Sequence, residues 1–239
     1  CYGYAKDGER WDALADLYEP GCTAKYVAGV FDPLRPRLQK LISEIKSAPR
    51  KPADGFNDFH VSVDRQEALS RLVAERIGFD FNRGRLDRST HPFCGGTHCN
   101  DVRMTSRYSK NCMLDGLGST MHETGHGLYE QGLDQNWISA PMGEAVSLSI
   151  HESQSRLWEN QVGRSLPFFR WAKQRMPEHF GNAAGHFSAE QLYSAANVVE
   201  PGFIRVDADE TTYNMHVMIR FEMERAMISR DLDVKDLPG

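Results

Sequence analysis

The chain has 239 residues, of which 40% are hydrophobic and 26% charged, a composition typical of a soluble globular protein. Its formal net charge of -5 argues against a nucleic-acid-binding surface and against a basic stripe for membranes. No apolar run is as long as the roughly 18 residues that a transmembrane helix needs. We expect residues 1–239 to form a single, mostly helical segment.

The cysteine pattern and the N-terminus bear on the compartment. Five cysteines are an odd number, and none of them form a C-x-x-C motif, so free thiols in an intracellular protein are the default. The first residues lack the apolar core of a signal peptide. We therefore predict a cytoplasmic protein. Because the chain begins with Cys1 rather than Met, we expect a processed, trimmed or incomplete product.

Two longer helices are predicted in the first third of the chain, after a short amphipathic helix over residues 11–18. Asp32 and Pro33 combine a capping residue with proline at the first helical position, which predicts a helix start. The spacing of Asp64 and Glu67 predicts a capping box that opens the next helix. We expect both helices to build core.

Residues 79–86 and 101–108 predict two short strands, the one convincing β region. In the second strand, charged and polar residues alternate with apolar or small ones. The alternation leaves two interpretations open. One is a hairpin with a solvated face, and the other is an edge strand that lines a cleft and holds a peptide by backbone hydrogen bonds.

The sequence HETGH over residues 122–126 is the central motif of the chain. Histidines four residues apart on a helix point the same way, so both imidazoles can reach one metal ion. This H-E-x-x-H arrangement is typical of zinc hydrolases. We expect His122 and His126 to bind zinc and Glu123 to activate a metal-bound water. The alternative is a pair of helical histidines without a metal.

The surroundings of the motif favour a buried helix. Gly125 and Gly127 flank His126 and let a neighbouring element approach closely, and Gly132 is a plausible C-cap. Four apolar residues fall at helical spacing and predict a buried face. They are Leu114, Leu117, Met121 and Leu128.

A third ligand is expected from a second helix, predicted over residues 139–158, because catalytic zinc sites commonly use two histidines and one glutamate. Glu144 and Glu152 are eight residues apart and can share a face, so spacing leaves both open. We prefer Glu152, because His151 and Ser153 flank it and can orient the ligands by hydrogen bonds.

A separate cluster of metal-ligand residue types lies in the sequence HPFCGGTHC. It offers an alternative, structural zinc site, although its spacings match no standard zinc finger. Its members are His91, Cys94, His98 and Cys99.

Helices are also predicted beyond this region. One runs over residues 167–176, and a capping box of Ser188 with Gln191 opens another. Asp209 or Thr211 caps a long last helix that continues to about residue 229. Methionines are frequent in this last helix and are expected to fill core.

Five motifs together resemble the M32 metallocarboxypeptidases, the family of carboxypeptidase Taq. They occur in the family's order and span most of residues 31–229. The motifs are His91-Pro92-Phe93, Asp101-Val102-Arg103-Met104-Thr105, His122-Glu123-x-x-His126, His151-Glu152-Ser153-Gln154 and Ile204-Arg205-x-x-Ala208-Asp209. With the predicted strands, the resemblance implies a mainly α, gluzincin-type metallopeptidase fold with a small β hairpin or short sheet beside the H-E-x-x-H helix.

The resemblance also implies an activity and its residues. His122, His126 and Glu152 would be the metal ligands, in place of Glu144, and Glu123 the general base and acid. The enzyme would be a metallocarboxypeptidase, a hydrolase that removes C-terminal residues from peptides with broad specificity. Zinc would be its metal, with cobalt accepted, and the protein would be a homodimer with peptide substrates and no nucleic-acid or membrane partner.

An exopeptidase of this kind must pair the substrate's C-terminal carboxylate with a cation. Arg205 is the first choice, by the family motif and because arginine binds carboxylates bidentately, and Arg103 is the second. Either arginine could instead form a structural salt bridge. His91, and Tyr213 or His216 on the last helix, could donate a hydrogen bond to the transition state.

Family members are about twice as long as this chain. We therefore expect a central segment of a longer protein, without the family's N-terminal helical portion and its C-terminal Gly-x-x-Gln motif. Two alternatives to a carboxypeptidase stay open: a gluzincin oligopeptidase or endopeptidase, and a non-catalytic helical fragment that binds metal.

Overall fold

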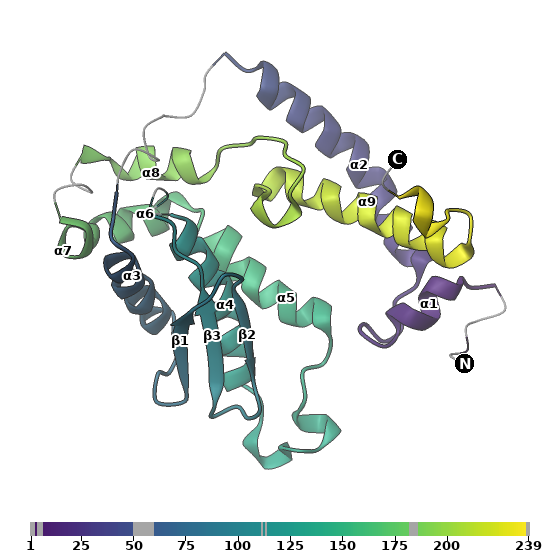
Figure 1. Ribbon diagram of the computed structural model, residues 1–239, viewed down its shortest axis with the longest axis horizontal. Coiled ribbons are helices and arrows are strands. Elements are labelled where there is room, and N and C mark those ends of the chain that lie inside the picture. The colour runs from purple at the N-terminus through teal and green to yellow at the C-terminus, as the bar shows by residue number, and fades with distance from the viewer. Residues whose placement is uncertain are drawn as a thin grey trace. The chain divides into compact units, whose positions relative to one another are not determined.

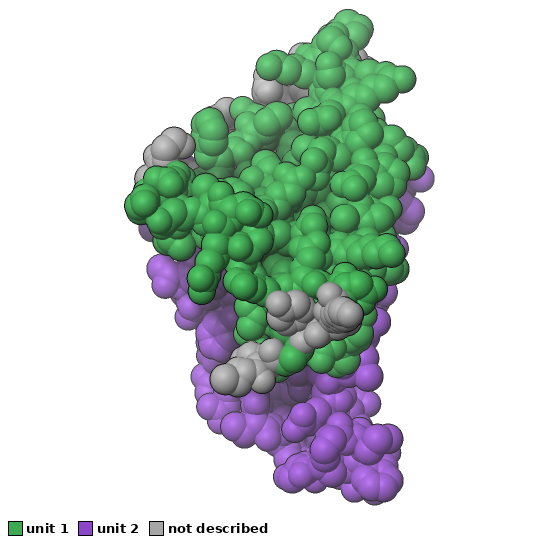
Figure 2. All heavy atoms as spheres, turned by 90° about the vertical axis from the view of Figure 1, so that its right-hand side faces the viewer, with its two compact units in different colours: residues 1–51, 198–239 green, residues 52–197 purple. Residues whose placement is uncertain are grey.

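The computed structural model is mainly helical with a small three-stranded sheet, as predicted. It describes residues 3, 7–49, 60–110, 112, 114–181 and 186–237. The chain divides into two compact units, which Figure 2 colours separately. Unit 1 comprises residues 1–51 and 198–239, and unit 2 comprises residues 52–197. Within the described ranges, no helix is long and apolar enough to span a membrane.

Unit 2 contains most of the helices and the whole sheet (Figure 1). The α-helices are α3 (Val63–Arg76), α4 (Asp115–Gln131), α5 (Leu148–Arg156), α6 (Leu166–Lys173), α7 (Met176–Phe180) and α8 (Ala189–Ala196). Two 3₁₀ turns, Gln135–Trp137 and Pro141–Gly143, lie between α4 and α5. A π-helix, Leu157–Val162, continues α5 directly.

The sheet has the order β1-β3-β2, with β1 over Gly84–Arg88, β2 over Phe93–Gly96 and β3 over Val102–Ser106. β1 pairs with β3 in parallel, and β2 pairs with β3 antiparallel. The two predicted strands therefore do not form a hairpin with each other. A third strand, β2, lies between them in sequence and supplies the antiparallel partner.

Helix α4 packs along one face of this sheet and carries the H-E-x-x-H motif (Figure 1). Gly127 makes the approach possible, because an added Cβ would lie 2.8 Å from the ring of Phe79 and 2.9 Å from the sulfur of Met104. Met104 and Phe79 belong to the small buried cluster under the sheet. The larger core lies among α3, α4 and α6–α8, with Leu69, Phe169 and other fully buried side chains.

The predicted helix over residues 139–158 is in fact two pieces. The segment Pro141–Gly143 is a 3₁₀ turn, and α5 begins only after Ser147, whose hydroxyl accepts a hydrogen bond from the backbone N–H of Ile150 at 3.3 Å. Glu144 lies exposed between the two pieces, while Glu152 lies in the middle of α5.

Unit 1 contains α1 (Arg10–Ala15), α2 (Ala24–Ser47) and α9 (Glu210–Ser229). The predicted start of α2 at Asp32 and Pro33 is wrong. The helix begins nine residues earlier, at Ala24, because the Thr23 hydroxyl caps it by accepting from the N–H of Tyr26 at 3.2 Å. Pro33 lies inside the helix.

Of the N-capping predictions for the other helices, two are confirmed and one is wrong. Asp209 caps α9, accepting from the N–H groups of the next turn, as predicted. The capping box of Ser188 and Gln191 is also confirmed. The box at α3 is wrong, because Asp64 and Glu67 instead pair with Arg88 on β1.

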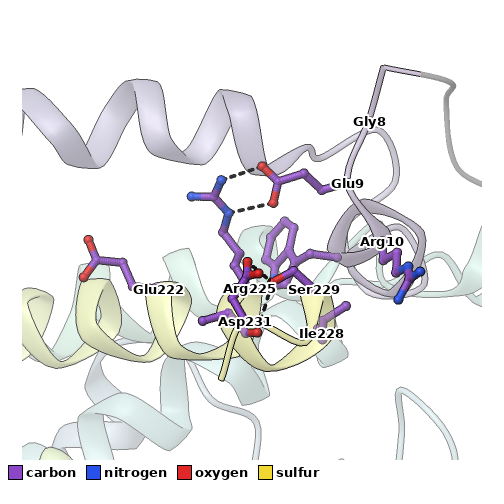
Figure 3. Close-up of a pocket in the computed structure, with 10 residues that line it drawn as sticks. Gly8, Glu9, Arg10, Glu222, Arg225, Ile228, Ser229 and Asp231 are labelled. Carbon is purple, nitrogen blue, oxygen red and sulfur yellow. Dashed lines mark hydrogen bonds and ion pairs between the residues drawn. The ribbon is translucent and has the colours of Figure 1, made fainter. Parts of the chain in front are cut away.

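Unit 1 has a pocket between the start of α1 and the end of α9, with a volume of about 640 Å³ (Figure 3). Glu9 lines this pocket, and its carboxylate accepts two hydrogen bonds from Arg225, at 2.8 and 2.5 Å. The ring of Phe221 packs edge-on against Trp11, with centroids 5.1 Å apart. These contacts tie the N-terminal helix to α9.

Candidate metal centre

The structure brings His122, His126 and Glu152 together, and these three residues are called the metal triad below. The Nε2 atoms of His122 and His126 lie 3.7 and 3.3 Å from Oε2 of Glu152. Helix α4 supplies both histidines and α5 supplies the glutamate. No other group of three or more histidine, cysteine or acidic residues in the described part of the chain is spaced to hold a metal.

The close approach of α4 and α5 builds the metal triad. At Gly125, an added Cβ would lie 2.5 Å from the Cα of Ser155, closer than any side chain could come. The Ser155 hydroxyl in turn donates to the carboxylate of Glu152 at 3.1 Å. The contact therefore depends on glycine, as the sequence pattern indicated.

The donor set and its spacing fit a tetrahedral zinc site. Two neutral nitrogens and one carboxylate oxygen are ligands that zinc prefers. Ligand bonds of about 2.0–2.1 Å in tetrahedral geometry place neighbouring donor atoms about 3.3–3.4 Å apart. The two distances to Glu152, 3.3 and 3.7 Å, are close to that edge. The glutamate side chain is 43% exposed.

His122 is held on its other nitrogen by Glu159. The Nδ1 atom lies 2.7 Å from Oε2 of Glu159, which also accepts from Arg156 at 3.0 Å, while Arg164 lies 3.7 Å from Oε1. Burial disfavours the ionised carboxyl, but the hydrogen bond from His122 and the two arginines outweigh burial and lower the pKa of Glu159 to about 2. Glu159 lies in the π-helix 157–162, a rare turn often found at functional sites.

His126 is held through a second histidine. Its Nδ1 atom lies 2.6 Å from Nδ1 of His151, whose Nε2 atom lies 2.7 Å from Oε1 of Glu130. The ring of Tyr129 packs edge-on against His151, with centroids 4.9 Å apart, and the tyrosine hydroxyl accepts from the N–H of Val146. Glu130 lies four residues after His126 on the same helical face, and this i, i+4 spacing is the one signal in the sequence that could have found it.

Glu123 is 5% exposed and lies between the two histidines in sequence. Burial raises its pKa to about 7, the nearby His122 opposes this, and the negative charges of Glu152 and Glu159 add to it. The same environment acts in the opposite direction on Glu152, where hydrogen bonding and charge from the histidines outweigh burial and lower the pKa. The two carboxyls of the site thus differ in proton affinity.

The alternative cysteine–histidine cluster does not converge in this way. His91 is exposed just before β2, and its carbonyl lies 3.4 Å from the hydroxyl of Thr105. The sulfur of Cys99 lies 3.9 Å from Nδ1 of His98, which accepts from the backbone of Asn100. These residues do not form a metal-binding group in the described chain.

The two candidate arginines have different surroundings. Arg103 lies on the exposed side of β3 and donates two hydrogen bonds to Asp101, at 3.0 and 2.8 Å. Arg205 belongs to unit 1, where it is partly buried and donates to the hydroxyl of Tyr213 at 2.6 Å. His216 lies one turn further along α9 in the same unit.

Comparison with known families matches residues 2–239 to the carboxypeptidase Taq (M32) metallopeptidases. The chain belongs to this family. Membership accounts for the metal triad, because a metallopeptidase requires a bound metal and the H-E-x-x-H helix presents ligands for one.

Several carboxypeptidases are similar to this M32 chain over almost its whole length. Thermostable carboxypeptidase 1 of Thermus thermophilus is 43% identical over 97% of the chain, and carboxypeptidase 1 of Bacillus subtilis is 35% identical over 96%. A solved structure of the Pyrococcus furiosus carboxypeptidase superposes with a TM-score of 0.91 at 37% identity, covering 99% of the chain. That of the Deinococcus radiodurans M32 carboxypeptidase gives 0.90 at 41% identity, covering 95%.

The chain spans a little less than half the length of these relatives. It covers 45% of the Thermus protein, 46% of the Bacillus protein, 48% of the Pyrococcus structure and 45% of the Deinococcus structure.

Proposed function

We propose that the chain carries the zinc centre of a metallocarboxypeptidase, which hydrolyses the C-terminal peptide bond of peptides with broad specificity. The observation that carries this proposal is the convergence of His122, His126 and Glu152 beside the buried Glu123. Membership in the carboxypeptidase Taq family supports it. As a member of that family, the chain would have peptides as its substrates.

Each residue of the centre has a role in the proposed reaction. The metal triad would hold the ion, which when bound would supply Lewis acidity to the scissile carbonyl and acidify water. Glu123 would take a proton from the attacking water and later give it to the leaving amine. In the metal-free chain, burial raises the pKa of Glu123 to about 7, so this carboxyl takes up a proton more readily than an exposed glutamate, as both steps require.

The substrate's terminal carboxylate would be bound by Arg205. The family motif around it and the bidentate chemistry of guanidinium support this role. Arg103 is the weaker candidate, because both of its hydrogen bonds to Asp101 would compete with a substrate. His91, and either Tyr213 or His216, are proposed to donate a hydrogen bond to the transition state.

Three further properties belong to the same proposal. Zinc is the proposed resident metal, with cobalt as a substitute, because the two imidazoles and one carboxylate suit both ions. A homodimer is proposed from the resemblance to the family, and a single catalytic segment is proposed for residues 1–239. A cytoplasmic location is proposed because the cysteines that the structure describes are free thiols.

The test uses one peptide in two forms, with a free and with an amidated C-terminus. The zinc-loaded chain is incubated with each, and the products are followed by mass spectrometry. A carboxypeptidase yields a ladder shortened from the C-terminus of the free peptide and leaves the amidated peptide intact.

Other outcomes identify the alternatives. Internal cleavage, or cleavage of the amidated peptide, would indicate a gluzincin oligopeptidase or endopeptidase. Retained zinc without hydrolysis of either peptide would indicate a non-catalytic metal-binding fragment.

A further inference from the structure

The two ring nitrogens of His126 face different partners. Nε2 faces the carboxylate of Glu152 at 3.3 Å, and Nδ1 faces Nδ1 of His151 at 2.6 Å. His151 in turn contacts Glu130 through Nε2 at 2.7 Å. Residues 130 and 151 are here called the Glu130–His151 pair. Among the contacts that the structure describes, only this pair links Nδ1 of His126 to a carboxylate through hydrogen bonds.

Hydrogen-bond chemistry determines where the protons lie along this chain of contacts. An ionised carboxylate only accepts, so Nε2 of His151 carries the proton that it donates to Glu130. In the neutral ring, Nδ1 of His151 then holds a lone pair. The short contact to His126 requires one proton, and it must come from Nδ1 of His126. When the metal is bound, the Nε2 atom of His126 is thereby left with its lone pair for the ion that Glu152 also holds.

The reversed arrangement would defeat metal binding. If Nδ1 of His151 were the donor, Nδ1 of His126 would be the acceptor. The neutral ring of His126 would then carry its proton on Nε2, where the metal ion would have to sit. The carboxylate of Glu130 selects against this arrangement, because it needs the proton on the far nitrogen of His151.

We propose that Glu130 and His151 are positioning residues, which together fix His126 in the tautomer that presents Nε2 to the metal. The proposal rests on the metal centre proposed above and adds to it two residues that touch neither metal nor substrate. Under this proposal the two histidine ligands are oriented in different ways. Glu159 contacts His122 directly, whereas Glu130 reaches His126 only through the imidazole of His151.

Packing keeps the Glu130–His151 pair in place. The His151 side chain is 16% exposed and that of His126 is 17% exposed, so water has little access as a competing partner. Tyr129 packs edge-on against the His151 ring and prevents it from turning away. Since Glu130 and His126 lie one turn apart on α4, His151 from α5 bridges two residues of one helical face.

The experiment measures zinc affinity of the full chain by competition with a chromophoric chelator. His151→Phe and Glu130→Leu remove the bridge and its carboxylate. His151→Gln keeps an acceptor for His126 and a donor for Glu130 on one amide. His179→Phe, on α7 outside the centre, is the matched control, and circular dichroism monitors folding. The second readout is the ¹⁵N shift of the His126 ring in the zinc-loaded parent, which reports which nitrogen carries the proton.

We expect His151→Phe and Glu130→Leu to weaken zinc binding about 10–100-fold, as loss of such partners typically does. His151→Gln should recover most of the affinity, and His179→Phe should match the parent. The ¹⁵N shifts should place the proton of His126 on Nδ1. Equal zinc affinity in the parent and both loss variants, or a proton on Nε2, would overturn the proposal. Zinc held as expected without peptide hydrolysis would leave it standing and reject only the carboxypeptidase activity.

Discussion

The carboxylate of Glu159 lies 2.7 Å from Nδ1 of His122, although 37 residues separate the two in the chain. The same carboxylate is held by Arg156, so its orientation toward the histidine is determined from two sides. A metal-ligating histidine usually donates its second N–H to such an acceptor, which increases its basicity and orients its ring. The relationship therefore ties the π-helix to the metal triad.

Replacing Glu159 by leucine should weaken zinc binding about 10–100-fold, because His122 loses its acceptor. Glu159→Gln should lose less, since its amide oxygen can still accept from the ring. Chelator competition measures both, with Glu178→Leu on α7 as the control. Unchanged affinity in Glu159→Leu would show that the ring of His122 is oriented by other contacts.

Glu123→Gln should abolish peptide hydrolysis while zinc stays bound, because the amide cannot accept the proton of the attacking water. The loss should be at least about 10²–10⁴-fold, the usual contribution of acid–base catalysis. Peptide release and zinc content are measured on the same preparation. Substantial residual turnover would reject the role assigned to Glu123.

Arg205→Met should reduce kcat/KM for peptides with a free C-terminus about 10–100-fold, since hydrogen bonds to charged groups contribute about 1.5–3 kcal/mol. Arg103→Met should have a smaller effect, because Arg103 already pairs with Asp101. Steady-state kinetics on one peptide compares them. A larger loss for Arg103→Met would reverse the assignment.

Gly125→Ala should destabilise unit 2 by about 1–3 kcal/mol, because the methyl group would force α4 and α5 apart. It should also weaken zinc binding, since Glu152 moves with α5. Gly118 offers a matched control on the same helix, with no atom within 4 Å of an added Cβ. Gly118→Ala should be neutral or stabilising by about 0.5–1 kcal/mol. Urea unfolding distinguishes the two, and equal midpoints would contradict the close contact.

The thiol of Cys94 should be unreactive at pH 8. Burial, with the negative charges of Glu123 and Glu130, raises its pKa to about 12. Roughly one thiol in 10,000 is then ionised at pH 8, against about a quarter for an unperturbed thiol. Because the folded pKa is raised, this group favours the folded state below about pH 8.5 and loses that effect as pH rises toward 12.

Iodoacetamide labelling followed by peptide mapping tests this for the metal-free chain. Cys94 should react at least about 100-fold more slowly in the folded chain than in urea. Equal rates under the two conditions would show that the thiol is not shielded beside α4.

The predictable part of the fold was local. Hydrophobic spacing and caps such as Asp209 determine helices within a few residues, and the H-E-x-x-H spacing places two ligands within one helix. Sheet pairing was not predictable, because strand patterns do not specify partners. Strand β2 runs antiparallel to β3 and carries the chain back along the sheet, so that β3 can run in the same direction as β1. The start of α2 was not predictable from Pro33, because proline is common at the first position of a helix, whereas Pro33 lies inside α2.

The site shows the same division. Glu152 could be preferred over Glu144 from its neighbours and from the family motif. The contacts that Glu130, His151 and Glu159 make with the metal triad could not be predicted from the sequence. Each contact depends on how closely α4 approaches the α5 segment and its π-helical continuation. That distance is determined at Gly125, where no side chain intervenes. The exposed position of Glu144 arises from the 3₁₀ turn before it, which helical periodicity does not predict.

The most direct test of the proposed centre is the zinc content of the purified chain by elemental analysis, beside the variants Glu152→Ala and Glu144→Ala. We predict one zinc per chain in the parent and in Glu144→Ala, and its loss in Glu152→Ala. A parent that holds no zinc after zinc is supplied, or a Glu152→Ala variant that keeps it, would contradict the metal triad.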